Sequence, residues 1–340
     1  FPVRFVLGDL YLWIGEYEKA AQEYYELINE NNYIINQYYR STWTVDNGVF
    51  VERKIEDQLW TRLFNFSNSE IITLIANSTE FGKNAELDSL SLIYPEITPS
   101  DIAIKNWNSQ LYYYNSKVFN DGDLRGDIGS YINPKSLNYE LISFLNLKKK
   151  ILNDYTILKY FLLSGQKTDA ICIYRVGLLY LRYAEAINRS GRPNVAFAVL
   201  KHGLKSSILK EDTIIPKKEK YISFTDTTGI LYRFIDFTKN VYDNNIGMHM
   251  RGCGNVNLSN DYKIPALNSL EDSILFVEDR IIDELALETA FEGNRFHDLM
   301  RIALRRNNPE YLANKISEKY FNKEEIKLKL LNKKNWFITP

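Results

Sequence analysis

The feature that most constrains this chain is a pair of amphipathic helices separated by a short turn, because the pair recurs along the sequence. Apolar residues follow helical spacing through 3–14, a turn is expected at Gly15-Glu16, and a second apolar stripe runs through 17–28. The first helix is expected to use one apolar face: Val3, Val6, Leu7, Leu10 and Ile14. The second is expected to bury Tyr17, Ala20, Ala21, Tyr24, Leu27 and Ile28. Together they predict a helical hairpin.

The spacing within this hairpin matches the tetratricopeptide pattern. Leu7, Gly8, Tyr11, Ala20 and Tyr24 occupy its key offsets, although Arg4 stands where that pattern has Trp. Small side chains at Gly8 and Ala20 would let the two helices pack closely.

The pattern returns twice. A second copy is indicated by Tyr180, Tyr183, Ala184, Ile187, Ala196 and Leu200, with its turn at Gly191-Arg192-Pro193. A weaker third copy is indicated by Ile282, Leu285, Ala286 and Thr289, turning near Gly293 into a helix over 296–303. Recurrence in phase predicts a scaffold of stacked helical hairpins.

The copies are not contiguous. The intervening stretches, 31–169 (the first insertion) and 211–274 (the second insertion), are interrupted by Gly and Pro, and they contain short β-like runs such as 71–75 and alternation at 221–237. We therefore expect a mainly α fold, in which tetratricopeptide-like hairpins form a superhelical scaffold and long loop-rich insertions carry short strands. The expected scaffold covers 1–30, 170–210 and 275–320.

Composition excludes several classes of function. The net charge is −1, which gives no electrostatic footprint for nucleic acid or an acidic membrane surface. The two cysteines, Cys172 and Cys253, do not make a disulfide framework, and Cys172 lies in an apolar run typical of a core. No stretch is apolar for the roughly 18 residues that a membrane span needs.

Motifs for metal and cofactor binding are also missing, so we expect neither. The three histidines form no H-E-x-x-H and there is no C-x-x-C, Walker loop or G-x-S-x-G elbow. The segment 121–127 resembles the start of a calcium loop, but Arg125 and Ile132 stand where acceptors belong. A polar turn with an Asp–Arg pair is the better interpretation.

Charged residues gather near the third hairpin. Glu288 and Glu292 lie four apart, as a pair of acid–base carboxylates would. Their arginine-rich surroundings favour a structural network instead, with Arg280–Glu284 and Asp298–Arg301 as intrahelical pairs. No catalytic residue is therefore assigned.

Aromatic residues in the first insertion are the candidates for ligand binding. Trp43, Tyr94 and Trp107 lie near turns, and Tyr112 begins a run of three tyrosines. Flat rings stack on sugars or peptide groups at little cost in ordering entropy. Packing onto the scaffold is the alternative for each, and Trp60, beside Leu63-Phe64, is the one most typical of a core.

The whole pattern resembles the SusD/RagB family of outer-membrane nutrient-uptake proteins. The resemblance rests on five segments: 10–20, 180–189 with its Arg-Tyr-Ala-Glu-Ala helix, Asp123-Leu124-Arg125, 280–301 with Phe291-Glu292-Gly293 and Arg295-Phe296-His297-Asp298-Leu299, and 335–338. The closing segment departs from the family's Trp-Pro-Ile-Pro, and 247–252 is similar to a segment of some members.

This resemblance implies a lipoprotein on the outer face of the outer membrane, partnered with a TonB-dependent transporter. It implies capture of oligosaccharides, or of peptides in one branch, without catalysis. It also implies a single SusD-like domain over 1–340 whose N-terminal part, with the lipid-bearing Cys, is missing. A tetratricopeptide-type scaffold for a partner peptide and a hydrolase built on Glu288 and Glu292 remain the alternatives. Ligand binding that weakens on Trp43→Ala or Trp107→Ala would favour the first.

Overall fold

The architecture comes from a computed structural model of the chain. The structure describes residues 2–36, 43–46, 49–53, 60, 68–76, 96–114, 117–119, 122–127, 129–136, 154–159, 170–220, 223–225, 231–253 and 256–337.

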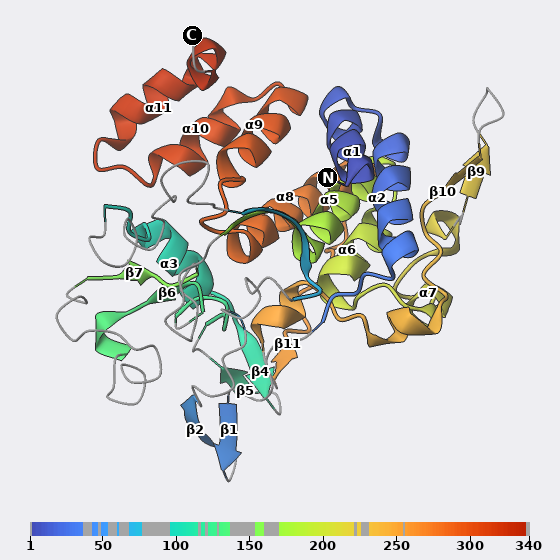
Figure 1. Cartoon of the computed structure of the whole chain (residues 1–340), viewed down its shortest axis with the longest axis horizontal. Helices are drawn as coiled ribbons and strands as arrows, with labels where there is room; N and C mark the ends of the chain where they lie inside the picture. The colour runs from blue at the N-terminus through green and yellow to red at the C-terminus, as the bar shows by residue number, and fades with distance from the viewer. Residues whose placement is uncertain are drawn as a thin grey trace.

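Helical hairpins packed side by side form the body of the molecule (Figure 1). They are α1 (Val3–Ile14) with α2 (Tyr17–Asn31), α5 (Val176–Arg189) with α6 (Pro193–Lys201), α8 (Leu270–Glu288) with α9 (Arg295–Arg305), and α10 (Pro309–Ser317) with α11 (Lys323–Leu331). Helix α5 packs against α2, α6 and α8 and therefore lies at the centre of the stack. The mainly α fold predicted from the sequence is confirmed.

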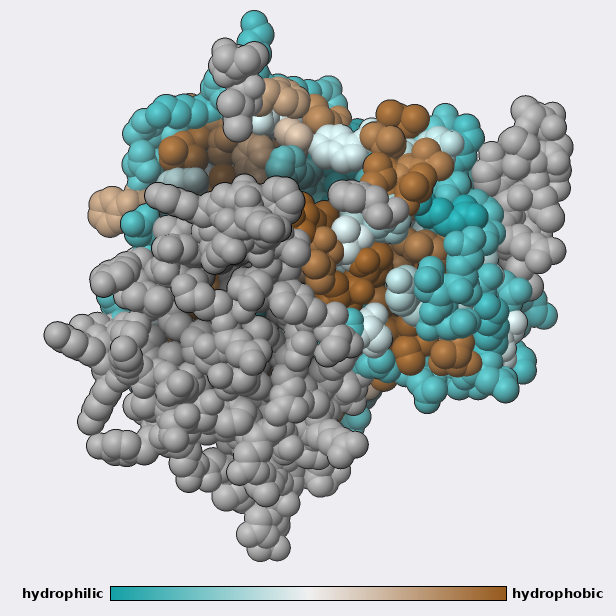
Figure 2. All heavy atoms as spheres, in the orientation of Figure 1, coloured by the Kyte–Doolittle hydropathy of each residue, from teal (hydrophilic) through white to brown (hydrophobic). Residues whose placement is uncertain are grey.

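In the first hairpin, the helices are confirmed but the predicted inner face of α1 is wrong. Val3, Leu10 and Ile14 are 73%, 58% and 71% exposed, whereas Phe5, Gly8 and Leu12 are buried. Both faces of α1 are apolar, so periodicity alone does not choose between them. Hydrophobic residues are visible at the position of α1 in the space-filling view (Figure 2).

The close approach predicted at Gly8 decides the inner face. A Cβ at Gly8 would lie 2.6 Å from a ring atom of Tyr24, which is too close for any real side chain. Tyr24 and Ala20 are fully buried against this side of α1. Gly15 then ends α1 with φ of +85°, a left-handed conformation in which glycine is favoured.

The second and third hairpins also form where the sequence predicts them. The stripe residues Tyr180, Tyr183, Ala184, Ile187, Ala196 and Leu200 are all fully buried. Helix α6 begins at Pro193, where the missing N–H costs little, and Gly293 adopts φ of +80° between α8 and α9. The α10–α11 hairpin extends past the predicted scaffold limit at residue 320.

The insertions add short antiparallel strands, as expected. Within the first insertion, β1 (Trp43–Asp46) pairs with β2 (Val49–Arg53), and β6 (Tyr131–Ile132) pairs with β7 (Thr156–Ile157). Strand β3 (Ile71–Ala76) pairs with β8 (Ala170–Arg175), which directly follows this insertion. Strand β4 (Tyr112–Tyr114) lies between β5 (Lys117–Phe119) and β11 (Asn257–Leu258), which joins the two insertions. In the second insertion β9 (Ser223–Thr225) pairs with β10 (Leu231–Arg233).

Short helices complete the insertions and place them against the scaffold. The first insertion contributes α3 (Asp101–Asn108), which contacts α8. Helix α7 (Ser206–Lys210) directly precedes the second insertion. The second insertion contributes a 3₁₀ turn, η7 (His249–Gly252), which contacts α6. Hydrogen bonds from Arg125 and Arg251 to Glu288 join both insertions to α8, and the candidate site lies there.

Candidate functional site

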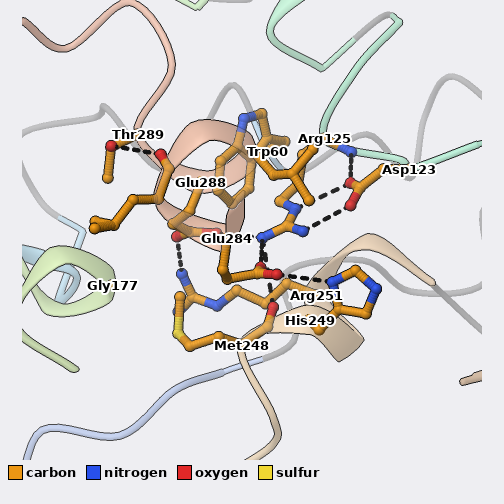
Figure 3. Close-up of polar contacts among 12 residues, drawn as sticks. Trp60, Asp123, Arg125, Gly177, Met248, His249, Arg251, Glu284, Glu288 and Thr289 are labelled. Carbon is orange, nitrogen blue, oxygen red and sulfur yellow. Dashed lines mark hydrogen bonds and ion pairs between the residues drawn. The ribbon is translucent and has the colours of Figure 1, made fainter. Parts of the chain in front are cut away.

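A buried cluster of charged side chains lies where the insertions meet α8 (Figure 3). The pairing of β3 with β8 sets its first members, because it brings Ile71 opposite Arg175 and so places Glu70 at the start of α5. There the Glu70 carboxylate accepts a hydrogen bond of 2.7 Å from the backbone N–H of Gly177. A carboxylate at this end of a helix is stabilised by the helix dipole and by otherwise unpaired N–H groups.

The turn at 123–125 supplies the next members. The guanidinium of Arg125 donates to both carboxylate oxygens of Asp123, at 2.9 and 2.6 Å, and the Arg125 backbone N–H donates to the same carboxylate at 2.8 Å. A Cβ at Gly252 would lie 2.1 Å from an Asp123 oxygen, so only glycine fits there. The polar turn with an Asp–Arg pair, preferred over a calcium loop, is confirmed for the described residues 122–127.

Helix α8 inserts its carboxylates between these arginines. Glu288 accepts hydrogen bonds from Arg125, Arg175 and Arg251, at 2.8, 2.7 and 2.7 Å. Glu284, one turn earlier, accepts from Arg125 at 2.6 Å and lies 2.7 Å from His249 Nδ1. Charge-assisted bonds of this kind fix side-chain positions strongly.

Glu292, just beyond α8, closes the cluster. Its carboxylate pairs with Arg175 at 2.9 Å and with Lys159 at 2.5 Å. The indole of Trp60 covers one side, with the Lys159 ammonium 5.6 Å from its centre. Burial, opposed by Glu292, lowers the pKa of Lys159 to about 8. Trp60 is fully buried, which confirms its predicted core role.

The environment of Glu288 and Glu292 is wrong for acid–base catalysis. Although burial opposes it, the surrounding arginines lower the pKa of Glu288 far below its ordinary value, and Arg175 with Lys159 lowers the pKa of Glu292. A glycosidase acid needs a raised pKa, and its partner carboxylate needs access to the reacting carbon. These two residues therefore do not support the hydrolase alternative.

A second buried network joins α5 to α8 and α9. Glu185 accepts from Arg301 and Arg305, Glu278 accepts from Arg189, Arg305 and Arg306, and Asp298 pairs with Arg182 and Arg301. The predicted Asp298–Arg301 pair is confirmed at 3.1 Å. The predicted Arg280–Glu284 pair is wrong, because Glu284 turns inward to Arg125 and Arg280 pairs with Asp283 at 3.0 Å.

An open polar cleft lies beside the first network, between α3 and α8. Its volume is about 360 Å³, in the range of small-molecule sites. It is lined by Asn106, Ser109, Gln110, His249, Tyr262, Arg280, Asp283, Glu284 and Leu287. Arg280 and Asp283 are each 42% exposed, so the cleft opens to solvent.

The floor of the cleft is held rigidly. The ring of His249 stacks on Tyr262 with centroids 4.5 Å apart and planes 12° from parallel, while Glu284 fixes its Nδ1. Tyr262 in turn stacks on Phe197 of α6. The cleft is therefore preformed, with its inner wall shared with the buried charge cluster.

Two of the predicted ligand-binding aromatics are core residues in this structure. Trp107 is 1% exposed, packs against Tyr131 and Phe291, and donates its indole N–H to the Leu287 carbonyl at 3.3 Å. Tyr112 is fully buried and donates its hydroxyl to Asp123 at 2.9 Å. Neither ring presents an exposed face for stacking on a ligand, because both rings are buried among other side chains.

The other two predicted aromatics have side chains outside the described part of the chain. Trp43 begins β1, with its backbone opposite Arg53, and its side chain lies outside the described part of the chain. Tyr94 lies wholly outside it. The two whose side chains the structure describes, Trp107 and Tyr112, lie in separate buried clusters, and the role of all four in binding stays a prediction.

Several residues that build the site carry no pattern in the sequence. Glu70, Lys159 and Arg175 are isolated charges next to short strands, where charges are normally solvated. Only the family-like segments 123–125, 247–252 and 280–301 pointed to this region. Gln110 and Tyr262 gave no signal in the sequence.

The thiols and possible metal ligands complete the inventory. Cys172 is half-buried and Cys253 buried, both as free thiols, and burial raises the pKa of each to about 12. Within the described residues, His, Cys, Asp and Glu side chains do not gather in a group of three or more that suits a metal ion. Among the helices that the structure describes, none is long and apolar enough to cross a membrane.

No protein-family model, curated protein or solved structure matches the chain. The resemblance to the SusD/RagB family therefore depends on the sequence segments alone.

Proposed function

We propose that this chain is a non-catalytic binding protein for oligosaccharides, and that the cleft between α3 and α8 is where the sugar binds. The observation that carries the proposal is the lining of this cleft, which combines hydroxyl, amide and charged groups.

The lining suits a ligand covered with hydroxyl groups. Sugar hydroxyls both donate and accept hydrogen bonds, and Ser109 and Gln110 have side chains that do the same. Arg280 and Asp283 add a donor and an acceptor at the exposed rim. The faces of the Tyr262 ring are stacked on His249 and Phe197, so the ring contributes only its edge to the lining.

The buried charge cluster supports binding over catalysis. Glu284 is the carboxylate nearest the cleft floor, and it is committed to Arg125 and His249. A floor fixed by such bonds preorganises the site, and preorganisation lowers the entropic cost of binding.

The resemblance alone carries the cellular part of the proposal. A SusD-like protein would be lipid-anchored at the outer face of the outer membrane and would deliver its oligosaccharide to a TonB-dependent transporter.

An array of oligosaccharides and peptides, followed by titration calorimetry of each hit, tests the proposal. We expect an oligosaccharide to bind, and Gln110→Ala to weaken it about five- to tenfold, because a hydrogen bond contributes about 1 kcal/mol. Gln22→Ala on α2, far from the cleft, where the amide donates to Glu26 on the same helix at 2.8 Å, is the matched control and should leave affinity unchanged. Binding of peptides alone, or of no array member, would refute the proposal.

A further inference from the structure

A second cavity adjoins the proposed sugar cleft. Its volume is about 170 Å³, and it lies among α3, α8 and the C-terminal end of α10. Asn106 and Asp283 line both cavities, so the two form a continuous surface along α8. A ligand of several units can occupy both.

Two cations in this cavity have no carboxylate partner among the described residues. Arg295, at the start of α9, donates one bond of 2.6 Å to the Ile282 carbonyl and forms no ion pair there. Lys319 also lines the cavity without an ion pair in the described part of the chain. Burial lowers the pKa of both, and Arg295 lowers that of Lys319 further, so the two positive charges act on one another.

The nearby carboxylates of Asp283 and Asp298 partly offset the effect of burial on the pKa of Arg295, but neither forms an ion pair with it. Asp283 is already bound by Arg280 at 3.0 Å and by Lys315 at 3.5 Å. Glu318 is exposed on the rim and forms no ion pair with Arg295 or Lys319 in the described structure. The buried cations of the two networks described above each have a carboxylate within bonding distance, whereas the half-buried Arg295 and Lys319, which is exposed at the rim, have none among the described residues.

Part of the cavity wall is apolar, beside the hydroxyl groups of Ser100 and Thr289. Ile102, Leu285 and Phe291 contribute to the apolar part. A cavity near 150 Å³ accommodates benzene, which is smaller than a sugar unit. An acidic sugar with its carboxylate toward the cations therefore matches the charge of this cavity and would extend into the adjoining cleft.

We infer that the preferred ligand is an acidic oligosaccharide, whose carboxylate-bearing sugar unit binds Arg295 and Lys319 while neighbouring units occupy the cleft beside Tyr262. This inference rests on the proposed function and adds the class of sugar. A carboxylate would supply the missing counter-charge, and charge-assisted hydrogen bonds to it would discriminate against neutral sugars.

The test compares acidic oligosaccharides with their own methyl esters, which keep the sugar backbone and lose only the charge. Oligogalacturonate, hyaluronan oligosaccharides and sialyllactose would each be titrated beside the matching ester. We expect at least one acid to bind about tenfold more tightly than its ester, with the advantage falling as salt is raised. If oligosaccharides bind but no acid exceeds its ester, this inference fails and the proposed function stands. If no oligosaccharide binds, the proposed function fails.

Variants locate the effect. Lys319→Gln should reduce the affinity for the acid about tenfold and leave the affinity for the ester unchanged. Lys210→Gln, an equal change of charge on the exposed end of α7, should alter neither. Arg295 also bonds to the Ile282 carbonyl, so Arg295→Gln removes both a charge and a structural hydrogen bond. Arg295→Lys, which keeps the charge, is made beside it to separate the two effects. Acid selectivity that survives both Lys319→Gln and a folded Arg295→Gln would overturn the assignment.

Discussion

Replacing Glu288 by Gln should destabilise the protein more than any single surface substitution. Glu288 is fully buried and accepts hydrogen bonds from Arg125, Arg175 and Arg251 at 2.7 to 2.8 Å. The variant keeps the size of the side chain but leaves three guanidinium groups around a neutral amide. An uncompensated buried charge is among the costliest defects in a protein interior.

The expected magnitude follows from these contacts. Unit charges about 4 Å apart interact by about 4 kcal/mol at an effective dielectric constant of 20, so three neighbours give an upper bound of about 12 kcal/mol. The bound overstates the loss, because the carboxylate's own desolvation cost disappears and the amide oxygen still accepts hydrogen bonds. Breaking a buried ion pair typically costs about 3–5 kcal/mol, and we expect a loss in this range.

Urea denaturation followed by tryptophan fluorescence and circular dichroism measures the loss. The control is Glu325→Gln, whose partner Lys329 is 60% exposed and one turn away on α11. It should change the free energy of unfolding by less than about 0.5 kcal/mol. If the two variants unfold at the same urea concentration, the interpretation of the cluster is wrong.

The same residue gives a pH dependence. The pKa of Glu288 is lower in the folded state than in the unfolded chain, where it is about 4.3. The unfolded state therefore takes up the proton first, and the stability from Glu288 is lost as the pH falls below about 5. Between about pH 5 and pH 3, the free energy of unfolding should fall less steeply for Glu288→Gln than for the unchanged protein. Equal slopes would contradict the lowered pKa.

The remaining predictions concern packing and thiol reactivity. Alanine normally stabilises an α-helix by about 1 kcal/mol over glycine. Gly177→Ala should instead lower the melting temperature, because the new Cβ would lie 2.4 Å from a Glu288 oxygen and 2.5 Å from Arg175 Nη1. A higher melting temperature would contradict that packing. Trp107→Ala should cost about 3–5 kcal/mol of folding free energy as a buried large-to-small change, whereas Trp13→Ala, at a ring that is 39% exposed, should cost far less, and similar losses would refute the burial. Because burial raises the pKa of Cys172 and Cys253 to about 12, Ellman's reagent at pH 8 should react slowly with the native protein and rapidly with both thiols in guanidinium chloride, and fast native labelling would argue against burial.

The scaffold was predictable from the sequence because each hairpin carries its own local signal. The stripe through Tyr180, Tyr183 and Ile187 has one apolar face, and the structure buries it. The error in α1 came from a helix that is apolar on two sides, where the close contact between Gly8 and Tyr24 decides the packing. A contact between two helices is not visible in the periodicity of either one.

The site was less predictable because long-range pairing creates it. Glu70 and Arg175 are 105 residues apart and meet through β3 and β8, and Arg251 joins them from the second insertion. Aromatic residues near turns suggested an exposed stacking surface, yet Trp107 and Tyr112 anchor the insertion to α8 and to Asp123. Their hydrogen-bond partners could not be known before the strands were placed.

A crystal structure of the protein with an oligosaccharide identified on the array tests the central claim most directly. The account predicts density for the sugar between α3 and α8, in contact with Gln110 and Tyr262. Density elsewhere, on the β1–β2 hairpin or along the helical hairpins with the cleft empty, would contradict it.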